Sequence, residues 1–97
     1  MMTIAGTSVN FSLTASSQSS AITRPTAENV GLHVANIGAD YCTIKFGSGS
    51  ATATLKAGAT VPPNGQIVVD WPKLADYLAV IGATTGNIVV ATPVIYR

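Results

Sequence analysis

Apolar and polar residues alternate along much of this chain of 97 residues, with the period of a β-strand that has one buried face. Residues 9–13 alternate Val, Phe and Leu with Asn and Ser, and residues 30–34 alternate Val and Leu with Gly and His. Apolar residues at helical spacing are almost absent. Val, Ile and Thr, which favour strands, make up 30 of the 97 residues. The pattern predicts an all-β protein.

Residues that favour tight turns separate these strands and predict their connections. Residues 36–40 contain Asn, Gly and Asp, which tolerate a left-handed backbone, so we expect a hairpin whose return strand is 41–46. The run Pro63-Asn64-Gly65 predicts a reversal of the chain. Between these turns, residues 47–50 form a flexible Gly-Ser loop, and the small residues 51–55 are expected to form a weak strand at a sheet edge.

The last third of the chain predicts three further strands. Residues 66–71 contain three consecutive apolar side chains, which is typical of a strand buried on both faces. Residues 71–76 predict one short helical turn across an end of the structure, because Pro72 suits a first helical position. Strands at 77–81 and 88–96 are expected to form a terminal hairpin. Pro93 lacks a backbone donor, so the final strand is expected to lie at an edge or to be bulged there.

The first 23 residues carry no charged side chain, and more than one interpretation of them stays open. Residues 15–22 are low in complexity and form either a flexible linker or a thin, hydroxyl-rich edge that extends the first strand. The segment 1–23 could also be a flexible arm that orders on a neighbouring molecule. It has no basic beginning and is rich in polar residues, so neither a signal peptide nor a membrane span is expected.

Together these elements predict a small antiparallel β-sandwich, jelly-roll-like or closed into a barrel, folded as a single domain over residues 1–97. It would have seven or eight strands and at most one short helical turn. Because so small a core stabilises the fold only narrowly, association is an expected source of stability. The expected core, with Trp71 capping one end, is Val9, Phe11, Leu13, Leu32, Val34, Ile44, Phe46, Ile67, Val69, Leu78, Val80, Ile88 and Val90.

Charged residues are rare in this chain. They make up 9% of it, where an average soluble domain has about 25%. With a net charge of +1, the protein has no basic field to neutralise a phosphate backbone, so we expect no nucleic acid as a partner. No membrane partner is expected, because no uncharged stretch fits a membrane span. Ser and Thr supply 20 of the 97 residues. A neutral, hydroxyl-rich surface lacks the charge that usually keeps protein surfaces apart.

Few residues suit catalysis or ligand binding. His33 is the single histidine and is expected at the surface or in an interface, because a tetrahedral metal site needs more ligands than one His and one Cys supply. Cys42 is expected to be reduced and buried as a small apolar side chain. No Gly-x-Ser-x-Gly nucleophile elbow occurs, and the spacing of Asp70 and Asp76 does not support an acid pair. We therefore expect no enzyme, with no catalytic, cofactor-binding or metal-ligating residue and no cofactor.

The aromatic residues leave one alternative open. Tyr41, Tyr77, Tyr96 and Trp71 have amphipathic faces that are suited to stacking on sugars, so they could form a glycan platform. In the other interpretation Trp71 lies in the core and the three tyrosines lie at sheet rims or subunit contacts.

A family resemblance adds to this picture. It is carried by Leu32-His33-Val34-Ala35-Asn36-Ile37-Gly38, Thr43-Ile44-Lys45-Phe46-Gly47, Val61-Pro62-Pro63-Asn64-Gly65-Gln66, Tyr77-Leu78-Ala79-Val80-Ile81-Gly82 and a final valine-rich strand. With these turn and strand motifs, residues 10–96 resemble the small all-β virion proteins of tailed bacteriophages, namely capsid cement or decoration proteins and related head accessory proteins.

The resemblance implies a jelly-roll-like sandwich that self-associates as a dimer or trimer. It implies a structural protein that sits on the outer surface of the capsid and bridges neighbouring major capsid subunits, after synthesis in the host cytoplasm. It implies no catalytic residues. The alternative is a tail-associated or host-attachment module that recognises a glycan or another surface partner.

Overall fold

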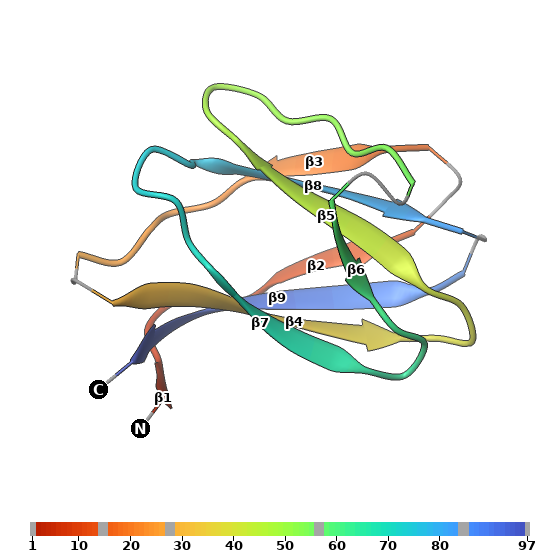
Figure 1. Ribbon diagram of the computed structural model, residues 1–97, viewed down its shortest axis with the longest axis horizontal. Helices are drawn as coiled ribbons and strands as arrows, with labels where there is room; N and C mark the ends of the chain where they lie inside the picture. The colour runs from red at the N-terminus through yellow and green to blue at the C-terminus, as the bar shows by residue number, and fades with distance from the viewer. Residues whose placement is uncertain (1, 14–15, 27–28, 56–57, 84–85, 97) are drawn as a thin grey trace.

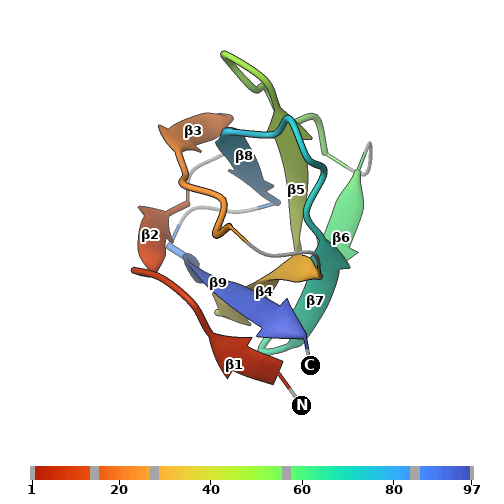
Figure 2. The same ribbon diagram turned by 90° about the vertical axis from the view of Figure 1, so that its left-hand side faces the viewer.

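Two antiparallel sheets lie face to face and enclose the core between them (Figures 1 and 2). The computed structural model describes residues 2–13, 16–26, 29–55, 58–83 and 86–96. These residues form no helix, so the predicted all-β sandwich is confirmed. Their nine strands are β1 (Met2–Ile4), β2 (Val9–Ser12), β3 (Gln18–Ala21), β4 (Val30–Ile37), β5 (Cys42–Gly47), β6 (Ala59–Val61), β7 (Gln66–Asp70), β8 (Tyr77–Gly82) and β9 (Ile88–Tyr96).

The five-stranded sheet contains β1, β2, β9, β4 and β7, and the four-stranded sheet has the order β3-β8-β5-β6. Strand β9 pairs with β4 along one side, and with β2 and then β1 along the other. Figure 2 shows the two layers, with β3, β8 and β5 above β9, β4 and β7. The described residues of the N-terminal segment lie in both layers, since β1 and β2 border β9 while β3 borders β8.

Both predicted hairpins are wrong, because the chain changes sheet at each of those turns. Strand β4 pairs with β7 and β9, whereas β5 pairs with β6 and β8. Strands β8 and β9 likewise lie in different sheets. Turn-forming residues indicate that a chain reverses, but backbone pairing is the same for every residue type. The turns therefore do not reveal which sheet the next strand joins.

The reversal at Pro63-Asn64-Gly65 is confirmed. The backbone N–H of Gly65 donates to the carbonyl of Pro62 over 3.1 Å, which closes a four-residue turn. Asn64 has a φ of 50°, a left-handed conformation that Asn tolerates better than most residues. This turn also carries the chain from the four-stranded sheet, at β6, into the five-stranded sheet, at β7.

Three expectations about strand positions need correction. Residues 51–55 form no strand, and the edge of the four-stranded sheet beside β5 is β6. Strand β7 is not buried on both faces, because it is an edge strand whose residues alternate between exposed and partly buried. The apolar run over residues 67–69 instead makes both faces of an edge strand apolar. Residues 15–22 contain β3, an edge strand of the opposite sheet rather than an extension of β2, although residue 15 lies outside the described residues.

Strand β9 lies inside its sheet despite Pro93, which corrects the expectation of an edge. The carbonyl of Pro93 accepts a hydrogen bond of 2.9 Å from the N–H of Ala5, just beyond the end of β1. In an antiparallel strand the N–H and C=O of one residue point to the same side. The missing donor of Pro93 therefore faces residues 5–8, where the neighbouring strand is interrupted between β1 and β2.

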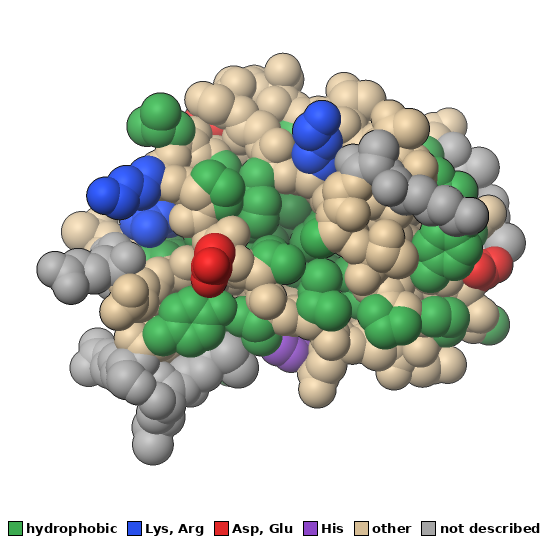
Figure 3. Space-filling view, in the orientation of Figure 1, with side chains coloured by type: hydrophobic (Ala, Val, Ile, Leu, Met, Phe, Trp, Pro, Cys, Tyr) green, Lys and Arg blue, Asp and Glu red, His purple; other side chains and the backbone are tan. Residues whose placement is uncertain are grey.

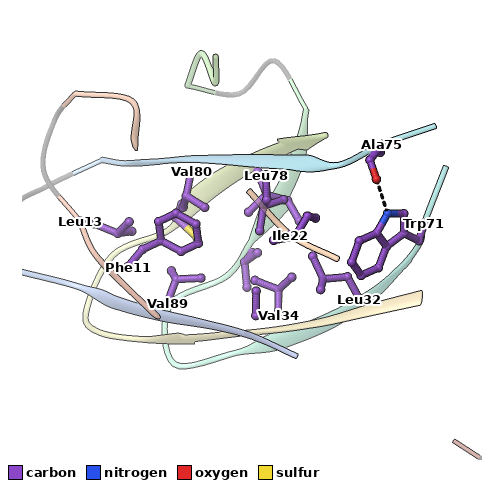
Figure 4. Packing of buried hydrophobic residues seen from close by; sticks show 14 of the residues in the cluster. Phe11, Leu13, Ile22, Leu32, Val34, Trp71, Ala75, Leu78, Val80 and Val89 are labelled. Carbon is purple, nitrogen blue, oxygen red and sulfur yellow. Dashed lines mark hydrogen bonds between the residues drawn. The ribbon is translucent and has the colours of Figure 1, made fainter. Parts of the chain in front are cut away.

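Most of the expected core is buried between the sheets (Figure 4). Trp71 is buried at one end of it, where its Nε1–H donates to the carbonyl of Ala75 over 2.8 Å and its ring lies 5.9 Å from that of Phe46. The predicted helical turn is a single hydrogen-bonded turn, with the N–H of Ala75 donating to the carbonyl of Pro72. Two side chains of β7, Ile67 and Val69, are partly buried and pack against this core.

The prediction that Ile88 and Val90 of β9 point into the core is wrong. Val89 and Ala91 are fully buried in the core, whereas Ile88 is 44% exposed and Val90 is only partly buried. Residues 88–91 are all apolar, so the alternation that identifies an inward face is missing there. Pairing with β4, in which Ile37 lies opposite Ile88, decides the direction of each side chain.

Candidate functional site: the outer face of the five-stranded sheet

The five-stranded sheet has an inner face against the core and an outer face that points away from it. Leu32 and Val34 of β4 lie in the core, so the alternate residues of β4 point outward. The strand register then places partners from β7, β9 and β1 on the same side. We define the outer face by Ile4, His33, Ala35, Ile37, Gln66, Val68, Ile88, Val90, Thr92 and Val94. The same register places Gly31 and Asp70 on this side, at one end of the sheet.

Large hydrophobic side chains are exposed on this outer face. Among the described residues, four of the five large hydrophobic side chains that are exposed belong to it, the fifth being Leu74 in a turn. The four are Ile4, 72% exposed, Ile37, 57%, Ile88, 44%, and Val68, 39%. Single exposed hydrophobic residues are common, but several on one surface indicate a surface that another molecule covers.

A hollow of ≈ 310 Å³ lies in the middle of the outer face. It is lined by Ile4, His33, Ala35, Val90, Thr92 and Val94. The polar atoms around it bond to one another: Nε2 of His33 lies 2.8 Å from Oε1 of Gln66, and the hydroxyls of Ser8 and Thr92 are 2.7 Å apart. Because these polar atoms are already hydrogen-bonded to each other, the hollow offers another molecule mainly apolar contact.

Charge is nearly absent from this sheet. Asp70 is the only charged residue in its strands as the structure describes them, and it lies at one end, opposite Gly31. The side chain of Tyr96 lies over Gly31, because a Cβ at Gly31 would collide with its phenol. Burial, and then the negative charge of Asp70, raise the pKa of Tyr96 above its ordinary value. On the side of the molecule that Figure 3 presents, charged side chains are few and scattered.

The outer face of the four-stranded sheet is different, because the chain itself covers part of it. Thr43 and Ala79 point away from the core, yet neither is exposed. The connection between β5 and β6 lies over this side, where Ala53 is 3% exposed and its N–H donates to the hydroxyl of Ser17 over 2.9 Å. A Cβ at Gly58 would meet the backbone of Ile44, so this connection packs closely on β5.

The residues singled out in the sequence do not come together in one site. His33 is partly buried on the outer face, and Cys42 is buried in the core as expected. Burial raises the pKa of the Cys42 thiol to about 11, which keeps it protonated at neutral pH. Asp76 accepts a hydrogen bond of 2.8 Å from the N–H of Gly49 and lies in a different segment from Asp70 of β7.

The described part of the chain contains no group of three or more His, Cys, Asp or Glu residues that could hold a metal ion. A larger hollow, of ≈ 380 Å³, lies beside β2 and the segment after β3, and the described residues that line it carry no titratable side chain. Of the aromatic residues, Trp71 is in the core, as one interpretation predicted. Tyr41 lies beside the β8–β9 connection, where its carbonyl accepts from Ala83, and Tyr96 ends β9.

The outer face was missed by the sequence analysis, although the sequence contains an indication of it. Ile88 and Val90 were assigned to the core because they are apolar and lie in a strand. Consecutive apolar residues at 67–69 and 88–91 mean that both faces of those strands are apolar. In a two-layered sandwich only one face of each strand points into the core, so the second apolar face had to be on the outside.

Comparison of the chain with protein-family models and with curated protein sequences finds no match. Within the described residues, no helix is long and apolar enough to cross a membrane.

Proposed function

We propose that this protein is a structural protein of a bacteriophage virion, a capsid cement or decoration protein that self-associates and bridges major capsid subunits on the outer surface of the head. The resemblance of residues 10–96 to such proteins motivates the proposal. The observation that carries it is the outer face of the five-stranded sheet, where four large hydrophobic side chains are exposed. Such a surface is suited to assembly with other proteins.

The distribution of charged and polar groups supports assembly rather than chemistry. Acid–base catalysis needs titratable groups within hydrogen-bond reach of one another, in a place that holds a substrate. Both hollows described above have mainly apolar or hydroxyl-bearing walls, and His33 is paired with the neutral Gln66. An uncharged apolar face, by contrast, loses little hydration when a protein partner covers it.

The alternative, a host-attachment module that binds a glycan through aromatic side chains, gains no support from their positions. Trp71 is 3% exposed, so its faces are occupied by the core. Tyr41 follows the end of β4, whereas Tyr96 lies beyond the start of β4, beside Asn29. Tyr77 begins β8, at the opposite end of that strand from Tyr41 and in the other sheet from Tyr96. A stacking platform needs exposed rings that lie next to one another, which these positions do not provide.

Binding to capsids tests the proposal directly. Purified protein is mixed with expanded empty heads of the phage that encodes it, and the heads are sedimented and analysed for bound protein. We expect saturable uptake at a fixed ratio to the major capsid protein, and no uptake by heads of an unrelated phage. A protein that stays in the supernatant with its own heads would overturn the proposal.

A further inference from the structure

We infer that the outer face of the five-stranded sheet is the surface through which two copies of this chain pair, face to face about a two-fold axis. The inference rests on the self-association included in the proposed function and adds the surface and the partner. In a two-fold pair the same patch is used by both copies, so the patch must be complementary to itself.

The charge of the outer face satisfies that condition. A two-fold axis brings like residues toward each other, so charged side chains near the centre would repel their own copies. Asp70, opposite Gly31, is the only Asp, Glu, Lys or Arg that the register of the described strands places on this side, and it lies at one end of the sheet. A strongly acidic or basic partner would find no opposite charges here. A second copy of the same face is nearly uncharged as well, so it needs no opposite charges.

The shape of the face is also suited to pairing with itself. Ile37 and Ile88 lie opposite each other in register and are both exposed at one end of β4. The hollow lined by His33, Val90 and Thr92 lies nearer the middle of the sheet. A two-fold rotation can seat the exposed isoleucines of each copy against the hollow of the other, which is the reciprocal contact that defines a symmetric interface.

The size of the face is close to the minimum for a specific dimer. The sheet is four strands wide, counting β1 and β2 as one position, which corresponds to about 19 Å at the usual strand spacing. The nine residues of β9 extend over about 30 Å at the usual rise per residue. The face therefore measures roughly 550 Å², so two copies would bury about 1,100 Å², which is above the area of most crystal contacts and near the lower limit of specific interfaces.

A matched pair of threonine substitutions tests the inference. Thr92→Lys places a positive charge in the hollow of the outer face, while Thr60→Lys places the same charge on β6, at an exposed position of the four-stranded sheet. The mass of each protein is measured by sedimentation equilibrium over a series of concentrations, and circular dichroism checks that each is folded. Ile37→Lys, at a side chain 57% exposed, is a second variant for which folding is not at risk.

We expect the wild-type protein and Thr60→Lys to form dimers with the same dissociation constant. Thr92→Lys and Ile37→Lys should weaken the dimer by about 100-fold, because each buries two like charges against an apolar surface. A wild-type protein that stays monomeric overturns the inference, as do folded Thr92→Lys and Ile37→Lys variants that dimerise like the wild type. Capsid binding is measured separately, so a dimer without capsid affinity would overturn the proposed function and leave this interface standing.

Discussion

Asn87 donates a hydrogen bond from Nδ2 to Oδ1 of Asn36 over 3.3 Å, at a point where both side chains are almost fully buried. The Nδ2 of Asn36 in turn donates to the carbonyls of Asp40, over 2.8 Å, and Pro62, over 3.2 Å. Two polar side chains therefore join the β4–β5, β6–β7 and β8–β9 connections. At each of these three connections the chain passes from one sheet to the other.

Removal of the Asn36 amide is expected to destabilise the fold. Asn36→Ala removes that donor from the carbonyls of Asp40 and Pro62 and leaves the buried amide of Asn87 without its Oδ1 acceptor, which should lower the free energy of unfolding by about 1–3 kcal/mol. Asn10→Ala is the control, because Asn10 is exposed on β2 and should change stability by less than about 0.5 kcal/mol. Urea unfolding measures both variants. Equal stability of the two variants would contradict a structural role for the Asn36–Asn87 pair.

Gly38 makes room for the side chains of Asn36 and Asn87. A Cβ at Gly38 would collide with the side-chain amide of Asn87, so Gly38→Ala should cost about 1–3 kcal/mol. The double variant Gly38→Ala/Asn87→Ala lacks the colliding amide. Its loss of stability should therefore be smaller than the sum of the losses in the two single variants. A double-mutant cycle by urea unfolding tests this. Strict additivity would show that the collision is not the cause.

The connection between β5 and β6 should be sensitive at the residue that faces the sheet and tolerant at its neighbour. Ala53 is 3% exposed, whereas Thr52 is exposed. Ala53→Glu would bury an unpaired charge, and we expect it to cost about 2–4 kcal/mol or to lift the connection off the sheet. Thr52→Glu should stay within about 0.5 kcal/mol of the wild type.

Hydrogen exchange distinguishes the two outcomes for Ala53→Glu. If the connection lifts, the amides of residues 51–53 should lose protection while those of β8 keep theirs. If the whole sandwich is destabilised, protection should fall in both sheets together. Wild-type stability in Ala53→Glu, with unchanged protection, would contradict the packing described here.

Because the thiol of Cys42 is buried, we expect the folded protein to become less stable at high pH. Burial raises the pKa of its thiol from 9.0 to about 11, although a backbone hydrogen bond at Val61 acts in the opposite direction. Because the folded state holds the proton more tightly, this contribution to stability is fully present below pH 9 and is lost as the pH rises through about 11. The raised pKa of Tyr96 acts with the same sign.

Comparison with Cys42→Ala isolates the thiol, since Tyr96 titrates in both proteins. Urea unfolding below pH 9 and near pH 11 should show a larger loss of stability in the wild type than in Cys42→Ala. The thiol should also react with alkylating reagents only in the unfolded protein at neutral pH. Parallel pH profiles for the two proteins would contradict burial of the thiol.

Much of the local structure was predictable from particular residues. The alternation around Phe11 and around Leu32 correctly predicted two strands and their inward faces. The Pro63-Asn64-Gly65 turn was also correct, because Asn64 accepts a left-handed backbone that few residues tolerate. In contrast, the inward face of residues 88–91 was wrong, since an unbroken apolar run contains no information about which side is buried.

The alternation of apolar and polar residues was enough to predict that this protein is built of strands, and its composition shows that it is poor in charge. The sequence did not show which sheet each strand joins, which face of β9 meets the core, or that one sheet is partly covered by the chain while the other is left open. Period-two alternation is a property of a single strand, whereas pairing uses backbone groups that every residue shares. The outer face of the five-stranded sheet exists only once β1, β4, β7 and β9 lie side by side.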